Sequence, residues 1–153
     1  MTLYLVRHAD AGSRKKWQLA DDLRPLSAKG DTQARVLAAA LADRPIERVL
    51  TSRYVRCVQT VEPLAAAHGV PVEEVAALSE EAASDEVLAL VADCTATPVA
   101  LCTHGNIIPV VLDHLRRRGV RFIHRPHAWE KGSVWVLATD DGEVTEASYL
   151  PPA

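Results

Sequence analysis

The sequence begins with a stretch that predicts a buried strand with a reactive end, Leu3-Tyr4-Leu5-Val6-Arg7-His8-Ala9-Asp10-Ala11-Gly12. Four apolar residues run directly into Arg7 and His8, as in a short core strand that ends at the molecular surface. In extended backbone, neighbouring side chains point to opposite faces. Arg7 and His8 can therefore serve one site only if the chain bends at His8-Ala9, and we expect a bend there.

The composition is that of one globular domain. The chain has 153 residues, of which 48% are apolar and 24% are charged, enough to bury a core without disulfides or a structural metal. We therefore expect residues 1–153 to form a single domain. The formal net charge of −3 gives no overall basic field, so the sequence predicts neither nucleic acid nor a membrane as a partner. Any anion site must be local.

Cysteine usage indicates a reducing compartment. Cys57, Cys94 and Cys102 are odd in number and include no C-x-x-C pair, as expected for reduced thiols that pack in the core. No apolar run reaches the roughly 18 residues of a membrane span, and the N-terminus leads into a strand and not into a signal sequence. We expect a soluble, cytoplasmic protein.

Helical and strand patterns follow the first strand in order. Ser27 is a suitable N-cap for a helix that ends at Asp43-Arg44-Pro45, and Ser52 is one for a second helix, in which Pro63 predicts a kink or a restart. Ser84 is expected to cap a third helix. The other predicted elements are strands at 46–50, 99–102, 132–137 and 144–149, an edge strand at 70–72, a helix at 107–118 and a hairpin turn at 140–142.

A second strand repeats the layout of the first. Val99 to Cys102 is apolar, and Thr103-His104-Gly105-Asn106 leads from it into a helix. Open α/β sheets place ligands where strands feed helix N-termini, because exposed backbone N–H groups and the helix dipole favour anions there. Two such strand ends, each with a histidine, predict one phosphate-sized site.

Two further patterns of charged residues are less specific. Arg14-Lys15-Lys16 follows the first strand closely, and it either holds a phosphate tail or an acidic partner or is a solvated run of charges. His124-Arg125-Pro126-His127 contains an H-x-x-H pair. Because no further ligands follow at a regular spacing, we interpret this motif as surface and predict no metal site.

Five motifs, taken together and in order, resemble the histidine phosphatase superfamily, also called phosphoglycerate-mutase-like. They are L-V-R-H-A at 5–9, R-P-L-S-A-K-G-D-T-Q-A at 24–34, T-S-R-Y-V-R-C-V-Q-T at 51–60, L-S-E at 78–80 and C-T-H-G-N at 102–106. The length resembles the small SixA-type members, and the sequence is also similar to the histidine phosphatase domain fused behind Nudix domains in some actinobacterial MutT-like proteins. The resemblance implies a three-layer α/β/α fold with a mostly parallel sheet flanked by helices.

The resemblance also implies roles for individual residues. His8 matches the residue that becomes phosphorylated, and Glu80 matches the general acid and base, with Glu81 as the alternative because one leucine sets the register. Ala9 stands where the family most often has Gly, which adds a methyl beside the nucleophile. The matched catalytic positions are Arg7, His8, Arg56, Glu80 and His104. The residues expected to bind the rest of the substrate are Arg14, Lys15, Arg53, Gly105 and Asn106.

These residue types suit phosphoryl transfer without a metal or another cofactor. A neutral imidazole is a good nucleophile near pH 7 if a hydrogen bond fixes its other nitrogen, and nearby cations help to keep His8 neutral. Arginine forks bind the equatorial phosphoryl oxygens, where charge accumulates. The short segment between Glu80 and His104 leaves little chain for a lid, so we expect an open site that favours hydrolysis over mutase chemistry.

We therefore predict a phosphatase that hydrolyses a phosphomonoester or a nucleotide phosphate through a phosphohistidine intermediate on His8. A phosphatase of phosphohistidine proteins is the alternative, so the partner is a phosphorylated small molecule or a phosphoprotein. A third hypothesis is a binding module that senses a phosphorylated ligand without turnover.

Overall fold

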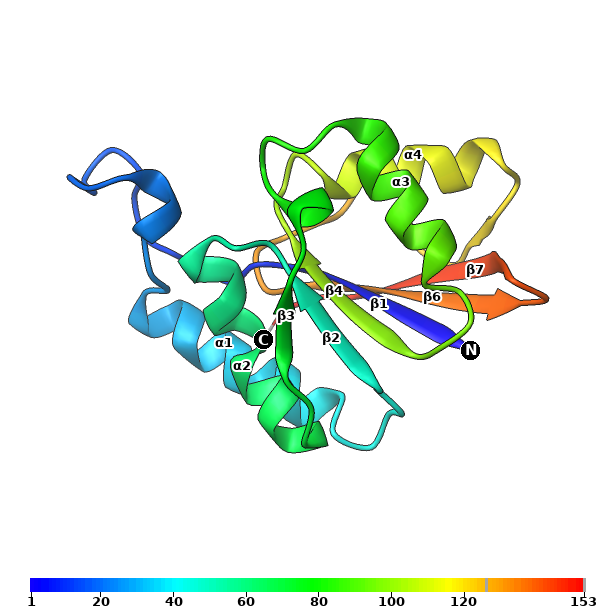
Figure 1. Ribbon diagram of the computed structural model, residues 1–153, viewed down its shortest axis with the longest axis horizontal. Helices are drawn as coiled ribbons and strands as arrows, with labels where there is room; N and C mark the ends of the chain where they lie inside the picture. The colour runs from blue at the N-terminus through cyan, green and yellow to red at the C-terminus, as the bar shows by residue number, and fades with distance from the viewer. Residues whose placement is uncertain (126, 153) are drawn as a thin grey trace.

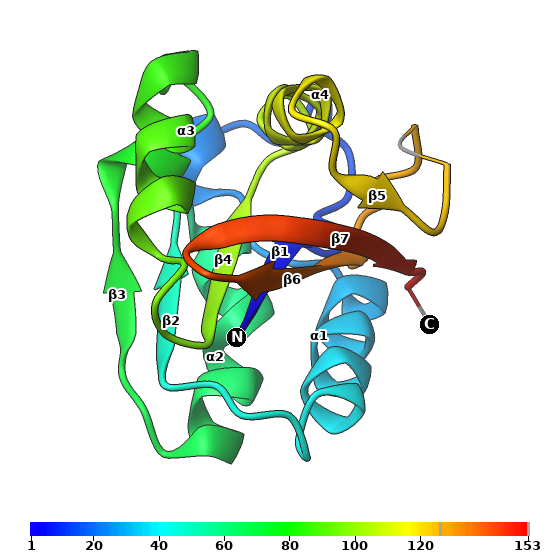
Figure 2. The same ribbon diagram turned by 90° about the vertical axis from the view of Figure 1, so that its right-hand side faces the viewer.

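A seven-stranded sheet forms the centre of the computed structural model, which describes residues 1–125 and 127–152 (Figures 1 and 2). The strands lie in the order β3-β2-β4-β1-β6-β7-β5. Their bounds are Thr2–Arg7 (β1), Arg48–Thr51 (β2), Val72–Glu74 (β3), Val99–Thr103 (β4), Arg121–Phe122 (β5), Val134–Asp140 (β6) and Glu143–Leu150 (β7). Neighbouring strands from β3 to β1 run parallel, whereas β6 is antiparallel to β1 and to β7. The mostly parallel sheet is confirmed.

Helices cover both faces of the sheet. In Figures 1 and 2, α1 and α2 lie below the sheet and α3 and α4 lie above it. The helices span Ala28–Ala40 (α1), Val55–His68 (α2), Ser84–Asp93 (α3) and Ile108–Arg117 (α4), with 3-10 turns at Asp21–Leu23 (η1) and Ala76–Leu78 (η2). This is the three-layer arrangement that the family resemblance implies.

The first strand is apolar throughout because both of its faces are buried. Leu3 and Leu5 pack in the core layer that contains α3 and α4, and Tyr4 and Val6 pack in the layer that contains α1 and α2. All four side chains are at most 1% exposed. Each such burial stabilises the fold by about 1.5–3 kcal/mol. Because both of its faces are covered, β1 lies at the centre of the molecule.

Local signals decided some helix ends and not others. The Ser27 side chain accepts a hydrogen bond from the Gly30 N–H and caps α1, as predicted. The prediction for Ser84 was wrong, since Ala83 is the N-cap residue of α3 and Ser84 is its first helical residue. The predicted restart at Pro63 is absent, because α2 is continuous and packs its apolar side against the sheet on both sides of the proline.

The second half of the chain follows its predicted pattern. The β6–β7 hairpin turns through Asp141 and Gly142, which both have positive φ, as tight hairpins require. The edge strand is β3, and the three cysteines are free and buried. In the H-x-x-H motif Pro126 lies outside the described residues, and His124 and His127 are exposed. No helix in residues 1–125 and 127–152 is long and apolar enough to cross a membrane.

Candidate active site

The candidate site lies where β1 and β4 end side by side. Arg7 is in register with Thr103 in this parallel pair, so the next residues, His8 and His104, leave the sheet together. The His8 N–H donates to the Thr103 carbonyl over 3.0 Å, and the Arg7 and His8 carbonyls both accept from the Gly132 N–H. The two imidazole rings lie 5.5 Å apart, edge to face. The Thr103 carbonyl on one side and the Gly132 N–H on the other therefore hold the backbone at His8, where the bend is predicted.

His8 is buried and held as a neutral ring. Its Nδ1 lies 2.8 Å from the Ala9 carbonyl, so Nδ1–H donates and Nε2 keeps its lone pair. Burial lowers the pKa of His8 to about 3, against the pull of the Ala9 carbonyl, and the neighbouring Arg56, His104 and Arg7 side chains lower it further. The Ala9 methyl is itself buried, and the Ala9 N–H donates to the Thr60 hydroxyl over 2.9 Å.

Arg7 lies against Gly105. A Cβ on Gly105 would come within 2.7 Å of the Arg7 Cζ, so any side chain at this position would displace the guanidinium. One Arg7 nitrogen, Nη1, donates to the Trp129 carbonyl over 2.8 Å. Burial lowers the pKa of Arg7. Gly105, expected to touch substrate, therefore serves the site by making room for Arg7.

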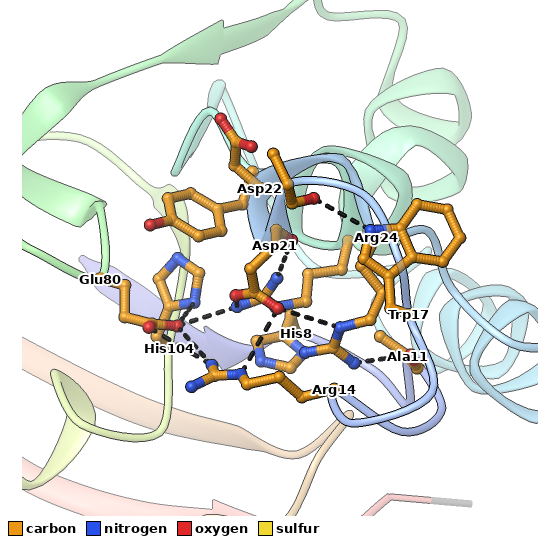
Figure 3. Close-up of polar contacts among 12 residues, drawn as sticks. His8, Ala11, Arg14, Trp17, Asp21, Asp22, Arg24, Glu80 and His104 are labelled. Atoms are coloured by element: carbon orange, nitrogen blue, oxygen red, sulfur yellow. Dashed lines mark hydrogen bonds and ion pairs between the residues drawn. The ribbon is translucent and has the colours of Figure 1, made fainter.

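Arg56 extends from the first turn of α2 and is fully buried. Its Nη1 donates to the Asp21 carbonyl over 2.9 Å, and its Nη2 lies 3.1 Å from Asp21 Oδ2 and 2.8 Å from Glu80 Oε2. The Tyr54 ring covers the guanidinium at 4.8 Å. Glu80 Oε2 also lies 3.4 Å from His104 Nδ1, so Arg56 belongs to one cluster with Arg7, His8 and His104, called the pocket below. Figure 3 shows Glu80, His104 and His8 in this cluster.

Ser52 holds His104 and does not cap a helix. Its Oγ lies 2.8 Å from His104 Nε2, with Cys57 Sγ at 3.6 Å from the same nitrogen. The prediction of Ser52 as a cap was wrong because Tyr54 is the N-cap residue of α2 and β2 carries Ser52 to the end of β4, where its N–H donates to the Cys102 carbonyl. A Ser52 hydroxyl that donates to Nε2 leaves the His104 proton on Nδ1, which faces Glu80.

Unpaired donors gather in this pocket. Among the described residues, four buried side-chain polar atoms have no hydrogen-bond partner, and three of them are Arg7 Nε, Arg56 Nε and His104 Nδ1. Buried N–H groups without an acceptor cost about 1–3 kcal/mol each, so their concentration at one place is informative. Three unpaired N–H groups beside a neutral histidine form a site for an anion with several oxygens.

Glu80 and Glu81 occupy different environments. Glu80 Oε2 lies 2.8 Å from Arg56 Nη2, 3.2 Å from Arg14 Nη2 and 3.4 Å from His104 Nδ1, and Asn106 donates to the Glu80 carbonyl over 2.8 Å. Glu81 instead accepts from the Tyr54 hydroxyl, outside the pocket. The side chain that lies among the pocket donors is therefore Glu80.

The remaining basic candidates, Arg14, Lys15 and Arg53, are all exposed. Arg14 bridges Glu80 and Asp21, and Arg53 bridges Glu81 and Asp22. Lys15 is exposed and makes no ion pair within the described ranges. Arg14 and Arg53 therefore belong to the rim of the site, not to the buried pocket.

Asp21 and Tyr54 are pocket residues that sequence reasoning missed. Asp21 stood in the sequence as one of two adjacent carboxylates before Arg24, and nothing in its spacing distinguished it from Asp22. Tyr54 precedes Arg56 by two residues, which is the helical offset least expected to bring side chains together. Only the structure brings both side chains against the Arg56 guanidinium.

A comparison with known protein families finds one that matches this chain. The histidine phosphatase superfamily (branch 1) matches residues 3–87, more than half of the chain, and the chain belongs to this family. The matched segment contains Arg7, His8, Arg56 and Glu80, and the β1–β4 register adds His104.

Particular relatives extend the comparison. An 8-oxo-(d)GTP phosphatase of Mycolicibacterium smegmatis is 36% identical over 160 residues, which cover 99% of this chain and 48% of the relative, so the chain spans about half the length of that protein. The solved structure of the protein histidine phosphatase SixA with tungstate superposes with a TM-score of 0.77 at 21% identity, covering 99% and 96% of the two chains. The α-ribazole phosphatase of Shigella flexneri gives 0.70 at 16% identity, covering 95% and 94%. At these identities the two structures establish the fold alone.

Proposed function

We propose that this protein hydrolyses a phosphomonoester through a phosphohistidine on His8, without a metal, and that its substrate is a nucleotide phosphate. The observation that carries the proposal is the neutral His8 ring beside three unpaired buried donors. A phosphoryl group has three equatorial oxygens, and these accept from the donors of Arg7, Arg56 and His104 as charge develops on them.

The first step is an in-line displacement at phosphorus. Glu80 takes up a proton from solvent when the phosphoryl group displaces it from Arg56 and Arg14. His8 Nε2 then attacks the phosphorus atom, the bond from phosphorus to the ester oxygen breaks, and the leaving oxygen takes that proton from Glu80. In the second step Glu80 takes a proton from water, the resulting hydroxide attacks phospho-His8, and the phosphorus–nitrogen bond breaks. Inorganic phosphate leaves, Glu80 releases its proton to solvent and returns to Arg56 and Arg14, and His8 is neutral again.

Glu80 has to move for the substrate to bind. In the ligand-free protein its carboxylate accepts from Arg56 and Arg14 and lies beside His104, which are contacts that a phosphate oxygen makes in the proposed complex. The Glu80 side chain is 29% exposed, so it has room to swing outward. A carboxylate displaced by the phosphoryl group stays next to the ester oxygen, where a general acid is needed.

Two observations favour a nucleotide phosphate. The relative that is 36% identical along nearly the whole of this chain acts on 8-oxo-(d)GTP according to its name. Arg14, which contacts Glu80, is 62% exposed, and Lys15 follows it in the chain and is exposed as well. Both cations suit the additional phosphates of a nucleotide.

A phosphohistidine protein is the second candidate substrate, favoured by the SixA-type fold. A panel of nucleoside mono-, di- and triphosphates including the 8-oxoguanine forms, sugar phosphates and a phosphorylated histidine-containing domain tests both substrates, with EDTA present. We expect nucleotide turnover. Turnover of the phosphodomain with indifference to nucleotides would contradict the nucleotide assignment.

The intermediate is tested with His8→Ala, and the exposed His127→Ala serves as the control. We expect His8→Ala to lose roughly 10³-fold or more in kcat and His127→Ala to match the parent. Rapid quenching with a radiolabelled phosphoryl donor should trap an acid-labile, base-stable adduct that His8→Ala lacks. An active His8→Ala variant would refute the mechanism, and binding without any turnover would favour a sensing module.

A further inference from the structure

The Asp21 carboxylate forms ion pairs with three arginines. Asp21 lies 3.1 Å from Arg56 Nη2, 3.2 Å from Arg24 Nε and 3.4 Å from Arg14 Nε (Figure 3). The three cations come from different parts of the fold, namely α2 and the two ends of the loop at 12–24. Burial alone would raise the pKa of Asp21, but Arg56 and Arg24 lower it, so the carboxylate stays ionised at neutral pH.

Hydrogen bonds within the loop hold Asp21 in this place in the ligand-free protein. Asp21 opens the η1 turn, and the buried Arg24 donates from Nη1 to the carbonyls of Ala11 and Gly12 over 2.6 and 3.2 Å. Trp17 donates from its indole nitrogen to the Ala20 carbonyl over 3.0 Å. The loop is thereby tied to the segment that follows His8, and Asp21 has a fixed position relative to the nucleophile.

Asp21 engages the end-on edge of the Arg56 guanidinium and makes no contact with its Nε–H. Its carbonyl and its Oδ2 accept from Nη1 and Nη2, the end-on edge of the fork. The Nε–H, on the side edge, is buried and unpaired. A planar fork that is held along one edge cannot rotate, so the free edge keeps the orientation that bidentate phosphate binding needs.

The neighbouring carboxylate makes none of these contacts. Asp22 pairs with Arg53, which is 49% exposed at the rim. The two aspartates share a charge, a side-chain length and a turn, and they differ in which arginine they hold. Asp22 is therefore a matched control for Asp21.

We propose that Asp21 is a positioning residue of this phosphatase: it orients Arg56 for the phosphoryl group and tethers Arg14 at the mouth of the pocket. This inference rests on the proposed function, because it assumes that Arg56 binds the transferred phosphoryl group. Asp21 acts through Arg56 and takes no part in proton transfer.

A double-mutant cycle tests the coupling. kcat/KM for a generic aryl phosphate and the Kd for inorganic phosphate are measured in Asp21→Asn, Arg56→Gln, the double variant and the control Asp22→Asn. Asp21→Asn should lower kcat/KM about tenfold, since a misplaced catalytic group costs one to two orders of magnitude. In the Arg56→Gln background the same change should cost less than about twofold, because coupled residues are not additive. Asp22→Asn should stay within about twofold of the parent.

Full additivity of Asp21→Asn and Arg56→Gln would overturn the inference, as would equal effects of Asp21→Asn and Asp22→Asn. If Asp21→Asn unfolds below the assay temperature, Asp21→Ser takes its place in the same cycle, and Asp21→Glu should restore part of the lost activity. Failure of the proposed function has a different signature, namely His8→Ala retaining activity or a parent protein that binds no inorganic phosphate.

Discussion

The inner pocket and its rim are built from similar residues and behave differently. The inner pocket consists of Arg7, His8, Arg56 and His104, and the rim consists of Arg14, Arg53, Asp22 and Glu81. The Arg56 and His104 side chains are 1% and 2% exposed, whereas Arg14 and Arg53 are 62% and 49% exposed. Three donors of the inner pocket are left unpaired, whereas Arg14 and Arg53 are paired with carboxylates.

The difference indicates that the position of an arginine, and not its residue type, determines how much it contributes to stability and to catalysis. Exposed ion pairs contribute about 0–1 kcal/mol and are screened by salt. A desolvated donor aimed at a developing charge contributes several times more to catalysis. In the proposed mechanism, the inner pocket therefore carries out the chemistry, and the rim affects which molecules reach it.

The largest effect should separate two arginines that lie three residues apart in the chain. Arg56→Gln should lower kcat/KM by about 10²–10³, as for other lost transition-state donors, and Arg53→Gln by about threefold or less. Steady-state kinetics with one aryl phosphate measures both variants. Equal losses would show that the division into an inner pocket and a rim has no catalytic meaning.

Adjacent glutamates give the next test. Glu80→Gln should lower kcat by about 10², typical of a lost general acid and base, and it should also bind inorganic phosphate several-fold more tightly because an uncharged amide competes less for Arg56. Glu81→Gln should change neither quantity by more than about twofold. Calorimetry gives the Kd, and an unchanged or weaker Kd for Glu80→Gln would contradict the displacement of Glu80 by phosphate.

The third test compares a buried and an exposed histidine by the pH dependence of the free energy of unfolding. In the unfolded chain His8 titrates near the ordinary histidine pKa of 6.5, whereas in the native protein its pKa is about 3. The native state therefore binds fewer protons between these values, and its stability falls as the pH is lowered, by up to about 1.4 kcal/mol per pH unit. Between pH 7 and pH 5, the free energy of unfolding, measured by urea denaturation, should fall by up to about 2 kcal/mol less for His8→Asn than for the parent. The control His127→Asn should lose as much as the parent.

The smallest effect concerns the rim alone. Arg14→Gln and Lys15→Gln should each raise the KM for a nucleotide about two- to threefold with kcat nearly unchanged, because exposed charges act weakly and through affinity. Raising the salt concentration should shrink the difference from the parent. Initial rates at low and high salt measure it, and a salt-independent fall in kcat would place Arg14 in the inner pocket instead.

Local sequence signals predicted what depends on neighbours in the chain. The apolar run of β1 predicted a central strand, Ser27 predicted the start of α1, and the glycine-containing turn predicted the β6–β7 hairpin. Ser52 and Ser84 carry the same capping signal as Ser27, yet neither caps a helix. A hydroxyl serves whichever partner the fold brings near, and for Ser52 that partner is His104.

The sequence by itself determined the strand Leu3 to Val6, its Arg7-His8 end and the second strand end with His104, because each of these depends on a few consecutive residues. Only the tertiary structure decided that the parallel register of β1 and β4 brings the two histidines together and that the Ala9 carbonyl holds His8. It also decided that Asp21, and not Asp22, holds Arg56. These contacts join residues far apart in the chain or depend on side-chain direction, which no pattern of neighbouring residues specifies.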